Sequence, residues 1–465
     1  MGEHSRQSTD NYDMHGFENR PFESLGFLRH LVQESDTLKQ LIEIKATNVA
    51  GLGFGIKYQS DFDFNRASEV EKNKATEEWV MLDNLYKYCN HNQKFSDLVK
   101  DIVYMREMYG FAFIEVLRNG LGQIAMFLKC KPDGMYIMKE RSISKSIKRP
   151  VNVNGKIVVT NVAIEFKVYC QTADSGEKIY FKEFGNTDRM NYKTGEFDEN
   201  TPDDELATEL IHFKIEDGWS EYGTPRWSQV IIDTMSSIKA SKVNFDFFEN
   251  GRINPMVMTV IGAKLDDKAV SNLQKNKGIE KAHAITVLNV EPSTPDSHTA
   301  NPNYEPKLPK VEVHQLVPNT HDNMYQELQK NIAVKIKETF CLPPIYSGSN
   351  SDYNRATADT ARAIAEEQVF APDRELTANL FNIIINSEMN IKYVEMHFNS
   401  PVLSSSKEVM ELVQMATNSG IITPNEGREI TGELLNRDYE ALEPESGDVN
   451  LQVQRLRAMQ KKQGV

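Results

Sequence analysis

Apolar side chains recur at three- and four-residue spacing through the first hundred residues, which is the pattern of amphipathic helices. Residues 24–56 follow this pattern as far as Gly51, a natural helix stop, and residues 69–90 repeat it. A further helix is predicted at residues 95–109, because Gly110 follows immediately. The folded part of the chain is therefore expected to begin with helices.

The pattern then changes to an alternation with a period of two. Two alternating segments in residues 111–129 are joined by Asn119-Gly120, a dipeptide that predicts a β-hairpin turn. Further β segments are predicted at residues 151–184 and 209–215, with a polar, acidic loop between them at 186–205. This first part of the chain is therefore predicted to be a mixed α+β domain.

A long helix is predicted next, and a second helix returns along it. Thr224 can cap the first helix, Pro225 suits its first turn, and the pattern continues to Asn250, a length of roughly 39 Å. The returning helix covers residues 321–340. The sequence between them predicts a compact α/β insert with strands 256–261, 284–290 and 311–317, a helix at 266–274 and an exposed loop at 291–310.

An alanine-rich helix follows the returning helix, after Cys341-Leu342-Pro343-Pro344 and a polar run. It is predicted at residues 355–370, with a bend at Pro372 and a continuation to Met389. Its small residues allow close packing, either inside one subunit or against copies of the same helix in a ring. In the second case, inter-subunit pairs would involve Asp359, Arg362, Glu366 and Glu367. The sequence leaves both alternatives open.

The C-terminal part is predicted to contain one strand and then helices. Residues 391–398 alternate as a strand does, and residues 407–418 form a helix that stops at Gly420. Thr423-Pro424-Asn425-Glu426 is a capping box that begins another helix. Residues 451–463 predict a marginal amphipathic tail.

Composition narrows the class of protein. A length of 465 residues predicts roughly two to four domains. The formal net charge of -14 disfavours tight generic binding to nucleic-acid phosphates, although nucleic acid could still slide past such a surface. The chain has no uncharged apolar run near the roughly 20 residues that span a bilayer, so no membrane partner is expected. Residues 1–19 are polar and lack the layout of a secretory signal.

Motifs that carry catalytic chemistry are missing from the sequence. It contains neither a P-loop, nor a nucleophile elbow, nor a zinc helix of the H-E-x-x-H type. The Gly51-x-Gly53-x-Gly55 run follows a helix and lacks the Lys-Ser/Thr of a phosphate loop, so it predicts a turn. Neither the scattered cysteines nor the histidines have metal-ligand spacing. We therefore expect no catalytic residue, no metal and no cofactor.

Five short motifs occur in an order that is informative as a whole. They are Tyr109-Gly110-Phe111-Ala112-Phe113-Ile114-Glu115-Val116, Tyr222-Gly223-Thr224-Pro225, Phe247-Phe248-Glu249-Asn250-Gly251 followed by Pro255, Phe340-Cys341-Leu342-Pro343-Pro344-Ile345-Tyr346-Ser347-Gly348, and Thr423-Pro424-Asn425-Glu426-Gly427-Arg428. This order resembles the portal proteins of tailed bacteriophages and related prophage elements. The resemblance covers about residues 25–435.

The resemblance implies an α+β fold of portal-like architecture. The implied parts are a flexible N-terminal arm (1–22), an α+β wing (23–222), stem helix 1 (223–255), a small α/β clip insert (256–317), stem helix 2 (318–342), a tunnel loop (343–354), a kinked tunnel helix (355–390), a wing strand and linker (391–404), and a helical crown with the C-terminal tail (405–465). The channel-lining residues would be Ser347, Gly348, Ser349, Asn350, Ser351, Asp352, Tyr353 and Asn354.

The function implied by the resemblance is that of a ring at one capsid vertex. Such a ring, usually a dodecamer, conducts double-stranded DNA during packaging and ejection and is not an enzyme. Its implied partners are further copies of the chain, the passing DNA, the terminase large subunit, the head-tail adaptor, and the major capsid and scaffold proteins. It would assemble in the host cytoplasm and reside in the virion. The alternative is a nucleic-acid-processing head-morphogenesis enzyme that uses the scattered acids and histidines.

Overall fold

The computed structural model describes residues 16–22, 24–153, 156–173, 175–249, 256–261, 263–265, 271, 290–292, 310–315, 322–348, 355–401, 406–435, 439, 442–447 and 449–462. The chain divides into two compact units. The first contains residues 1–351 and 367–398, and the second contains residues 352–366 and 399–465.

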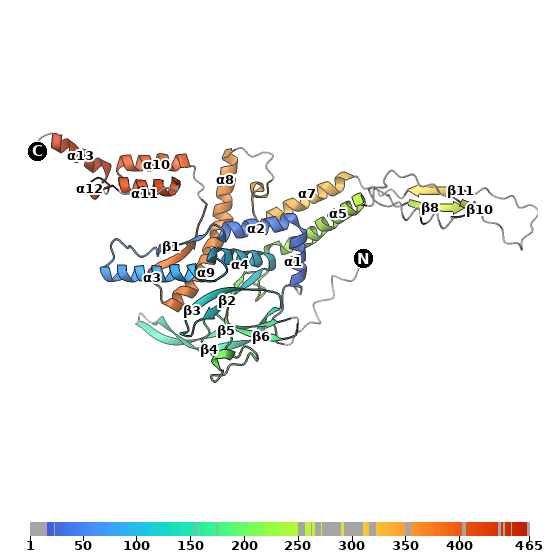
Figure 1. Ribbon diagram of the computed structural model, residues 1–465, viewed down its shortest axis with the longest axis horizontal. Coiled ribbons are helices and arrows are strands. Elements are labelled where there is room, and N and C mark those ends of the chain that lie inside the picture. The colour runs from blue at the N-terminus through green and yellow to red at the C-terminus, as the bar shows by residue number, and fades with distance from the viewer. Residues whose placement is uncertain are drawn as a thin grey trace, which may run out of the picture. The chain divides into compact units, whose positions relative to one another are not determined.

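The first unit contains long helices and short 3-10 turns (Figure 1). The helices are α1 (Leu25–Glu34), α2 (Asp36–Ala50), α3 (Glu69–Lys87), α4 (Phe95–Tyr109), α5 (Ile231–Glu249), α7 (Asp322–Thr339) and α9 (Ala371–Met389). The 3-10 turns are η1 (Asp203–Glu205), η2 (Arg226–Val230) and η4 (Pro344–Ser347). The helices predicted at residues 69–90, 95–109 and 321–340 are confirmed.

One predicted helix ends at Gly51 as expected but is interrupted on the way. Residues 24–56 form α1, α2 and the strand β1 (Phe54–Tyr58) instead of a single helix. Ser35 separates the two helices, because its hydroxyl accepts a hydrogen bond from the backbone N–H of Leu38 and so caps α2. β1 pairs antiparallel with β12 (Val394–Phe398), a contact between segments far apart in the sequence that local periodicity does not reveal.

The main sheet has six strands in the order β3-β2-β7-β6-β5-β4. Their bounds are β2 (Phe111–Arg118), β3 (Ile124–Cys130), β4 (Met135–Val153), β5 (Lys156–Thr172), β6 (Lys178–Glu183) and β7 (Glu209–Lys214). All neighbours are antiparallel except β6 and β7, which pair in parallel over two residue pairs. The hairpin at residues 111–129 is confirmed, whereas the β region predicted from residue 151 begins earlier, at Met135.

Aromatic side chains form the core between this sheet and the helices that cover it. Phe381 of α9 lies against Phe95 of α4, Phe127 of β3 and Phe213 of β7, with ring centroids 5.1, 6.4 and 5.4 Å away. Each of these rings is at most 3% exposed. Fully burying a large apolar side chain contributes about 1.5–3 kcal/mol, so this cluster holds α4 and α9 on the sheet.

α5 and α7 form an antiparallel pair, as predicted (Figure 1). Lys335 of α7 pairs with Asp233 of α5 at 3.2 Å, and Gln329 donates to Ser241 at 3.0 Å. Thr224 does not cap the first helix, which corrects the prediction. Its hydroxyl donates to the carboxylate of Asp217, and the chain passes through η2 before α5 begins.

The insert between α5 and α7 contains paired strands. β8 (Met256–Ile261) and β11 (Lys310–Gln315) are antiparallel partners, which confirms two predicted strands. β9 (Ala263–Leu265) pairs with β10 (Val290–Pro292). The helix predicted at 266–274 lies outside the described residues except for residue 271, and so do residues 284–289 of the strand predicted at 284–290.

The predicted bend at Pro372 has a more specific form. The chain is α-helical in α8 (Arg355–Ala365), π-helical in η5 (Glu366–Phe370) and α-helical again in α9. Proline has no N–H and its ring excludes the carbonyl four residues earlier from the usual helical bond. The wider π turn directly before Pro372 accommodates this loss.

The described part of the second unit is helical apart from its connections. It contains α8, α10 (Ser406–Ser419), α11 (Pro424–Leu435), α12 (Pro444–Gly447) and α13 (Leu451–Lys462). The predicted capping box is confirmed: the Thr423 N–H donates to the Glu426 carboxylate at 2.7 Å, and the Glu426 N–H donates to the Thr423 hydroxyl at 3.3 Å. Gly420 ends α10 with a positive φ of 73°.

Candidate functional site: a cluster of paired charges at Asp373

The predicted channel loop is only partly described. Ser347 and Gly348 lie at its start, whereas residues 349–354 lie outside the described residues. The Ser347 hydroxyl donates to the Pro344 carbonyl at 2.9 Å and closes the η4 turn. Gly348 follows with a φ of 74°, a left-handed conformation that glycine adopts without strain. The start of the loop is thus a fixed turn.

Buried side chains fix the position of the segment that connects α7 to this turn. Cys341 has a φ of 52°, unusual for a residue with a Cβ, and its neighbours Phe340 and Leu342 are buried. Tyr346 lies edge-on to Phe370 of η5, with ring centroids 5.4 Å apart. The turn that precedes the loop therefore contacts the π-helical segment η5, which follows α8.

Two motifs that are far apart in the sequence meet directly. A Cβ at Gly110 would lie 2.6 Å from the backbone nitrogen of Pro225, and one at Gly223 would lie 2.8 Å from the Gly110 carbonyl oxygen. Both glycines also have positive φ angles, 89° and 94°. Only glycine fits this crossing, which brings η2 against the end of α4.

A cluster of charged side chains lies at this crossing. Asp373, at the start of α9, pairs with Lys45 of α2 at 2.8 Å and with Arg226 of η2 at 3.1 Å. Arg106 of α4 lies 3.5 Å from Asp373 and 3.0 Å from Glu107, whose other oxygen pairs with Arg226 at 3.2 Å. We call these five residues the Asp373 joint.

Three members of the Asp373 joint are buried, Asp373 is largely buried, and Arg226 is half-buried. Lys45 and Arg106 are each 2% exposed, and Glu107 is fully buried. The indole N–H of Trp227, itself fully buried, donates to the Glu107 carbonyl at 3.1 Å. Buried charges are tolerated only when they are paired and hydrogen-bonded, so this geometry requires all four segments in place together.

The pKa shifts follow from burial and mutual attraction. Burial lowers the pKa of Lys45 even though Asp373 and Glu107 attract its charge. Burial alone would raise the pKa of Asp373, but Lys45, Arg106 and Arg226 together hold it below its usual value. Burial opposes the charge of Arg226, yet Glu107 and Asp373, with a smaller contribution from Cys341, raise its pKa. Asp373 and Arg226 therefore remain ionised at neutral pH.

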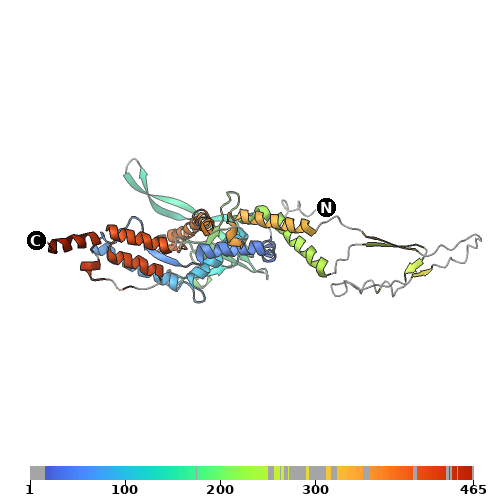
Figure 2. The same ribbon diagram turned by 90° about the horizontal axis from the view of Figure 1, so that it is seen from above.

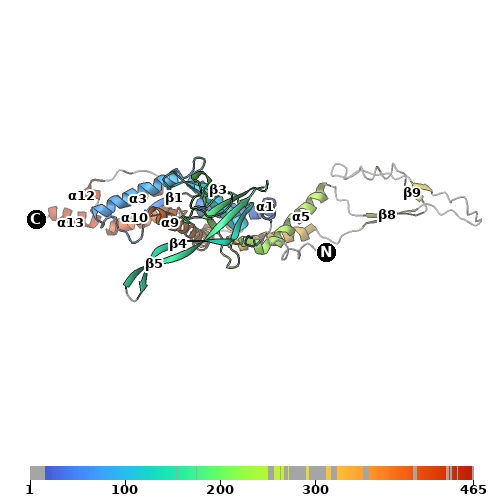
Figure 3. The same cartoon turned by 90° about the horizontal axis from the view of Figure 1, so that it is seen from below.

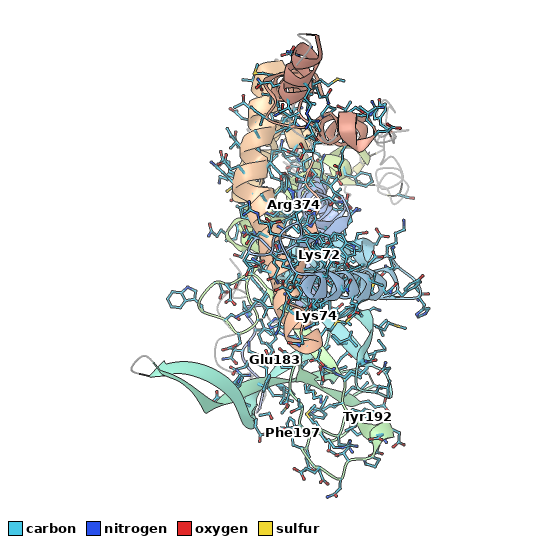
Figure 4. The ribbon with its side chains drawn as sticks, turned by 90° about the vertical axis from the view of Figure 1, so that its left-hand side faces the viewer. Lys72, Lys74, Glu183, Tyr192, Phe197 and Arg374 are labelled. Atoms are coloured by element: carbon cyan, nitrogen blue, oxygen red, sulfur yellow. The ribbon has the colours of Figure 1, made fainter. Side chains whose placement is uncertain are left out.

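The ion pairs of the Asp373 joint have a structural role, because they connect separate elements rigidly. It joins α2, α4, the approach to α5 and the start of α9, and its position can be followed in Figure 4 through Arg374, the residue after Asp373. None of its members was singled out from the sequence. The only signal was local: Asp373 follows Pro372 at a helix start, and Arg226 follows the Thr224-Pro225 motif.

The residues predicted to pair between subunits lie on α8 and η5. Asp359, Arg362 and Glu367 are exposed in the single chain, and Glu366 is half-buried. The alanines of α8 divide between environments: Ala365 is buried, Ala358 and Ala361 are half-buried, and Ala363 is exposed. The inter-subunit role of the four charged residues stays a prediction.

The described residues contain neither a metal-binding cluster nor a membrane-spanning helix. Within them, no group of three or more His, Cys, Asp and Glu side chains is placed to hold a metal ion. No described helix is both long enough and apolar enough to cross a membrane. The enzyme alternative thus gains no observation in its favour from this part of the chain.

Comparison with known proteins identifies relatives that match most of the chain. No protein-family model matches the sequence. It is 31% identical over 425 residues to YqbA of Bacillus subtilis (strain 168), which is named as an uncharacterized protein, and the match covers 89% of this chain and 81% of YqbA. The phage-like element PBSX protein XkdE of the same organism is 29% identical over 426 residues, covering 89% of this chain and 83% of XkdE.

Solved structures share the fold. A chain from the neck of an empty GTA particle matches with a TM-score of 0.51 and 13% identity, covering 89% of this chain and 95% of that one. The virion of the native gene transfer agent (GTA) particle contains a chain that matches with a TM-score of 0.50. With the order of the five motifs and the identity to YqbA and XkdE, the protein belongs to the portal protein family of tailed bacteriophages and related prophage elements.

Proposed function

We propose that this protein is the subunit of a portal ring, a channel at one capsid vertex through which double-stranded DNA is packaged and ejected. The observation that carries the proposal is the antiparallel pair of α5 and α7 with a strand-paired insert between them, in a chain of the portal family. This is a stalk with a head at its end. The chain would be a structural part of the virion and not an enzyme.

The parts of the subunit follow from this proposal. The wing would cover residues 23–222, and residues 391–404 would add a further strand and a linker to it. The pairing of β1 with β12 supports this assignment. The stem would be residues 223–255 and 318–342, and the clip would be 256–317. Residues 343–354 would form the tunnel loop, 355–390 the tunnel helix, and 405–465 the crown with the C-terminal tail.

The Asp373 joint supports a mechanical role for the frame around the loop. It fastens the approach to α5 and the start of α9 to the wing helices α2 and α4. A channel under load needs its loop held on a rigid base, and buried ion pairs with fixed partners supply one. The loop sequence, residues 347–354, contains no Lys or Arg, which suits a lining that must not grip phosphates.

The partners of the ring follow from the same proposal. Further copies of the chain would complete the ring, usually as a dodecamer, and DNA would pass through it. The clip would dock the terminase large subunit during packaging and the head-tail adaptor afterwards. Major capsid and scaffold proteins would contact the outer surface during assembly in the host cytoplasm.

The first test is the assembled mass and shape of the purified protein. Native mass spectrometry should give a closed oligomer, and negative-stain images should show rings with a central channel. If only monomers are found under all assembly conditions, the proposed function is wrong.

A second test concerns the tunnel loop. Deletion of residues 349–352 should leave ring assembly intact and reduce DNA packaging or retention, measured as nuclease-protected DNA per particle. Replacing the same four residues by Gly-Ser-Gly-Ser keeps the length of the loop and changes its side chains. This variant therefore distinguishes an effect of loop length from an effect of the side chains. If the deletion abolishes folding instead, the loop has a structural role and does not line a channel.

A further inference from the structure

The long strands β4 and β5 continue beyond the rest of the main sheet as a two-stranded ribbon. β5 pairs with β6 only from Val168 to Thr172, whereas β4 and β5 remain paired from Arg141 and Lys167 out to Val153 and Lys156. The ribbon projects away from the sheet in Figures 2 and 3. We call the paired residues 142–153 and 156–164 the arm. Among the described residues, the last backbone hydrogen bond on the outer edge of β4 is made by Lys139, before the arm begins. No further strand pairs with either edge of the arm in the described part of the chain.

The arm has an unusual composition for a segment without neighbours. It is rich in β-branched residues, and its charges are all positive: no acidic residue occurs between Arg141 and Glu165. The arm carries the bases Lys145, Lys148, Arg149 and Lys156. The residues opposite the last three are Asn161, Thr160 and Val153, so none of these three bases has an acidic residue directly across the ribbon.

An isolated two-stranded ribbon of this kind is marginally stable in water. A long edge of β-branched residues also pairs readily with other chains unless something covers it. The arm is therefore incomplete within one copy of the chain. A partner that covers the arm should carry acidic groups to pair with its bases and some apolar surface to pack against its β-branched residues.

The acidic loop at residues 186–205 has the complementary composition. It contains seven acidic and two basic residues. Glu196, Asp198, Glu199 and Asp204 are exposed, and Phe197 beside them is 39% exposed, high for an aromatic ring. In Figure 4 the arm leaves the sheet on one side, while Tyr192 of the acidic loop lies toward the other.

The acidic loop is a fixed surface. Arg189 donates to the Thr201 carbonyl and pairs with Asp203 at 2.6 Å. Lys193 pairs with Glu205 at 2.9 Å, and Asn191 donates to the same carboxylate at 2.8 Å. A preorganised loop loses little conformational entropy when it is bound, so it can act as a docking surface.

We propose that the arm of one copy docks on the acidic loop of a second copy in the ring. A ring is built from heterologous contacts, in which one patch on each subunit meets a different patch on the next. The arm and the acidic loop are such a pair, with opposite charge and with apolar residues in both. This inference rests on the proposed function, because it assumes that the ring forms.

A second copy fits the arm better than nucleic acid does. The chain carries 67 acidic and 53 basic residues, so an approaching polyanion is repelled by most of the protein. Four bases on a ribbon rich in β-branched residues do not resemble the dense Lys and Arg patches of DNA-binding surfaces. The acidic loop, by contrast, is present on every copy at the same concentration as the arm.

The test reverses the charges on each side separately and then together. The arm variant is Lys145→Glu, Lys148→Glu and Arg149→Glu. The loop variant is Glu196→Lys, Glu199→Lys and Asp204→Lys, which leaves Asp203 paired with Arg189. The control reverses three exposed bases that lie elsewhere in the first unit: Lys39, Lys74 (labelled in Figure 4) and Lys131, each to Glu.

Native mass spectrometry should show about a tenfold or greater loss of rings in the arm variant and in the loop variant, because like charges then face each other. The six substitutions combined in one chain should restore the rings, and the control should assemble as the wild type does. Far-UV circular dichroism and the Tm of each monomer check that the variants fold.

The outcomes separate this inference from the proposed function. If the wild type forms no ring, the proposed function fails. If the wild type and both reversed variants form rings equally well, or if the combined variant does not recover them, the contact between arm and loop is wrong. If the arm variant assembles normally but its rings retain less DNA, the arm binds nucleic acid and the inference is overturned.

Discussion

The Asp373 joint and the pair of helices α5 and α7 both connect segments that are far apart in the chain, but they do so in different surroundings. At the joint, Lys45 and Asp373 are 3% and 13% exposed in their side chains. Along the helix pair, Lys335 and Asp233 are 57% and 31% exposed. Exposed pairs are typically worth between zero and about 1 kcal/mol, whereas breaking a buried pair costs about 3–5 kcal/mol.

The apolar residues of the two regions differ in the same way. Trp227 beside the joint is fully buried. On α5, Ile232 is 79% exposed and Phe245 is 65% exposed, and Val334 on α7 is 50% exposed. The joint is thus complete within one chain, while the helix pair leaves an apolar surface that neighbouring copies would cover in the proposed ring.

The largest expected effect comes from the joint. Asp373→Asn removes the charge that faces Lys45, Arg106 and Arg226 and should lower the free energy of unfolding by about 3–5 kcal/mol. The folded-state pKa of Asp373 lies below the ordinary 3.8, so its contribution is present at neutral pH and is lost as pH falls through that lowered value. Urea denaturation at pH 7 measures the loss.

The matched control is Asp233→Asn, which removes the same group from the exposed pair. It should change the free energy of unfolding by less than about 1 kcal/mol. If the two variants lose the same stability, the distinction between the regions is wrong.

A partly buried histidine should make the sheet sensitive to acid. His212 on β7 stacks on Phe113 with centroids 4.8 Å apart, and burial, followed by the nearby Lys167 and Lys214, lowers its pKa from 6.5 to about 3. Between these values the unfolded chain binds the proton and the folded chain does not. Stability should therefore fall as pH drops below 6.5, by about 1.4 kcal/mol per pH unit.

The variant that tests this is His212→Phe, which keeps an aromatic ring against Phe113 and removes the titration. Urea midpoints at pH 7, 6 and 5 should fall less steeply for the variant than for the wild type. All other titrating groups are shared, so equal slopes for the two proteins would contradict the assigned cause.

The comparison also explains what the sequence could and could not predict. The helices α5 and α7, the β2–β3 hairpin and the capping box at Thr423 could be predicted because each depends on local spacing or on adjacent residues. The resemblance to the portal family could be seen because the five motifs occur along this chain in the order that is found in that family.

The joint could not be predicted, because its members come from four separate segments. Lys45 occupies an apolar-spaced position of α2, and Arg106 and Glu107 appear as ordinary helix-end charges. Only the folded crossing at Gly110 and Gly223 brings them to Asp373. β1 was missed for the same reason: its partner, β12, lies more than three hundred residues later.

A smaller effect is expected from the exposed ion pair of the helices. A double-mutant cycle with Lys335→Ala and Asp233→Ala should give a coupling of about 0.2–1 kcal/mol in the isolated subunit. Raising the salt concentration should reduce the coupling, because exposed charges are screened. A coupling well above this range would mean that the pair is more buried in solution than its exposure indicates.

The smallest effect on folding is expected where the apolar surface of α5 faces solvent. Ile232→Ser and Phe245→Ser together should change the free energy of unfolding of the monomer by no more than about 0.5 kcal/mol per site, because neither side chain is packed in the single chain. The same double variant should assemble poorly if neighbouring copies bury this surface, as measured by the fraction of rings in native mass spectrometry.

Ile336→Ser on α7, where the side chain is 1% exposed, is the control that should destabilise the monomer itself. If the α5 variant unfolds as easily as that control, the surface is already packed within one chain. If it assembles normally, the stem of the ring does not depend on this surface.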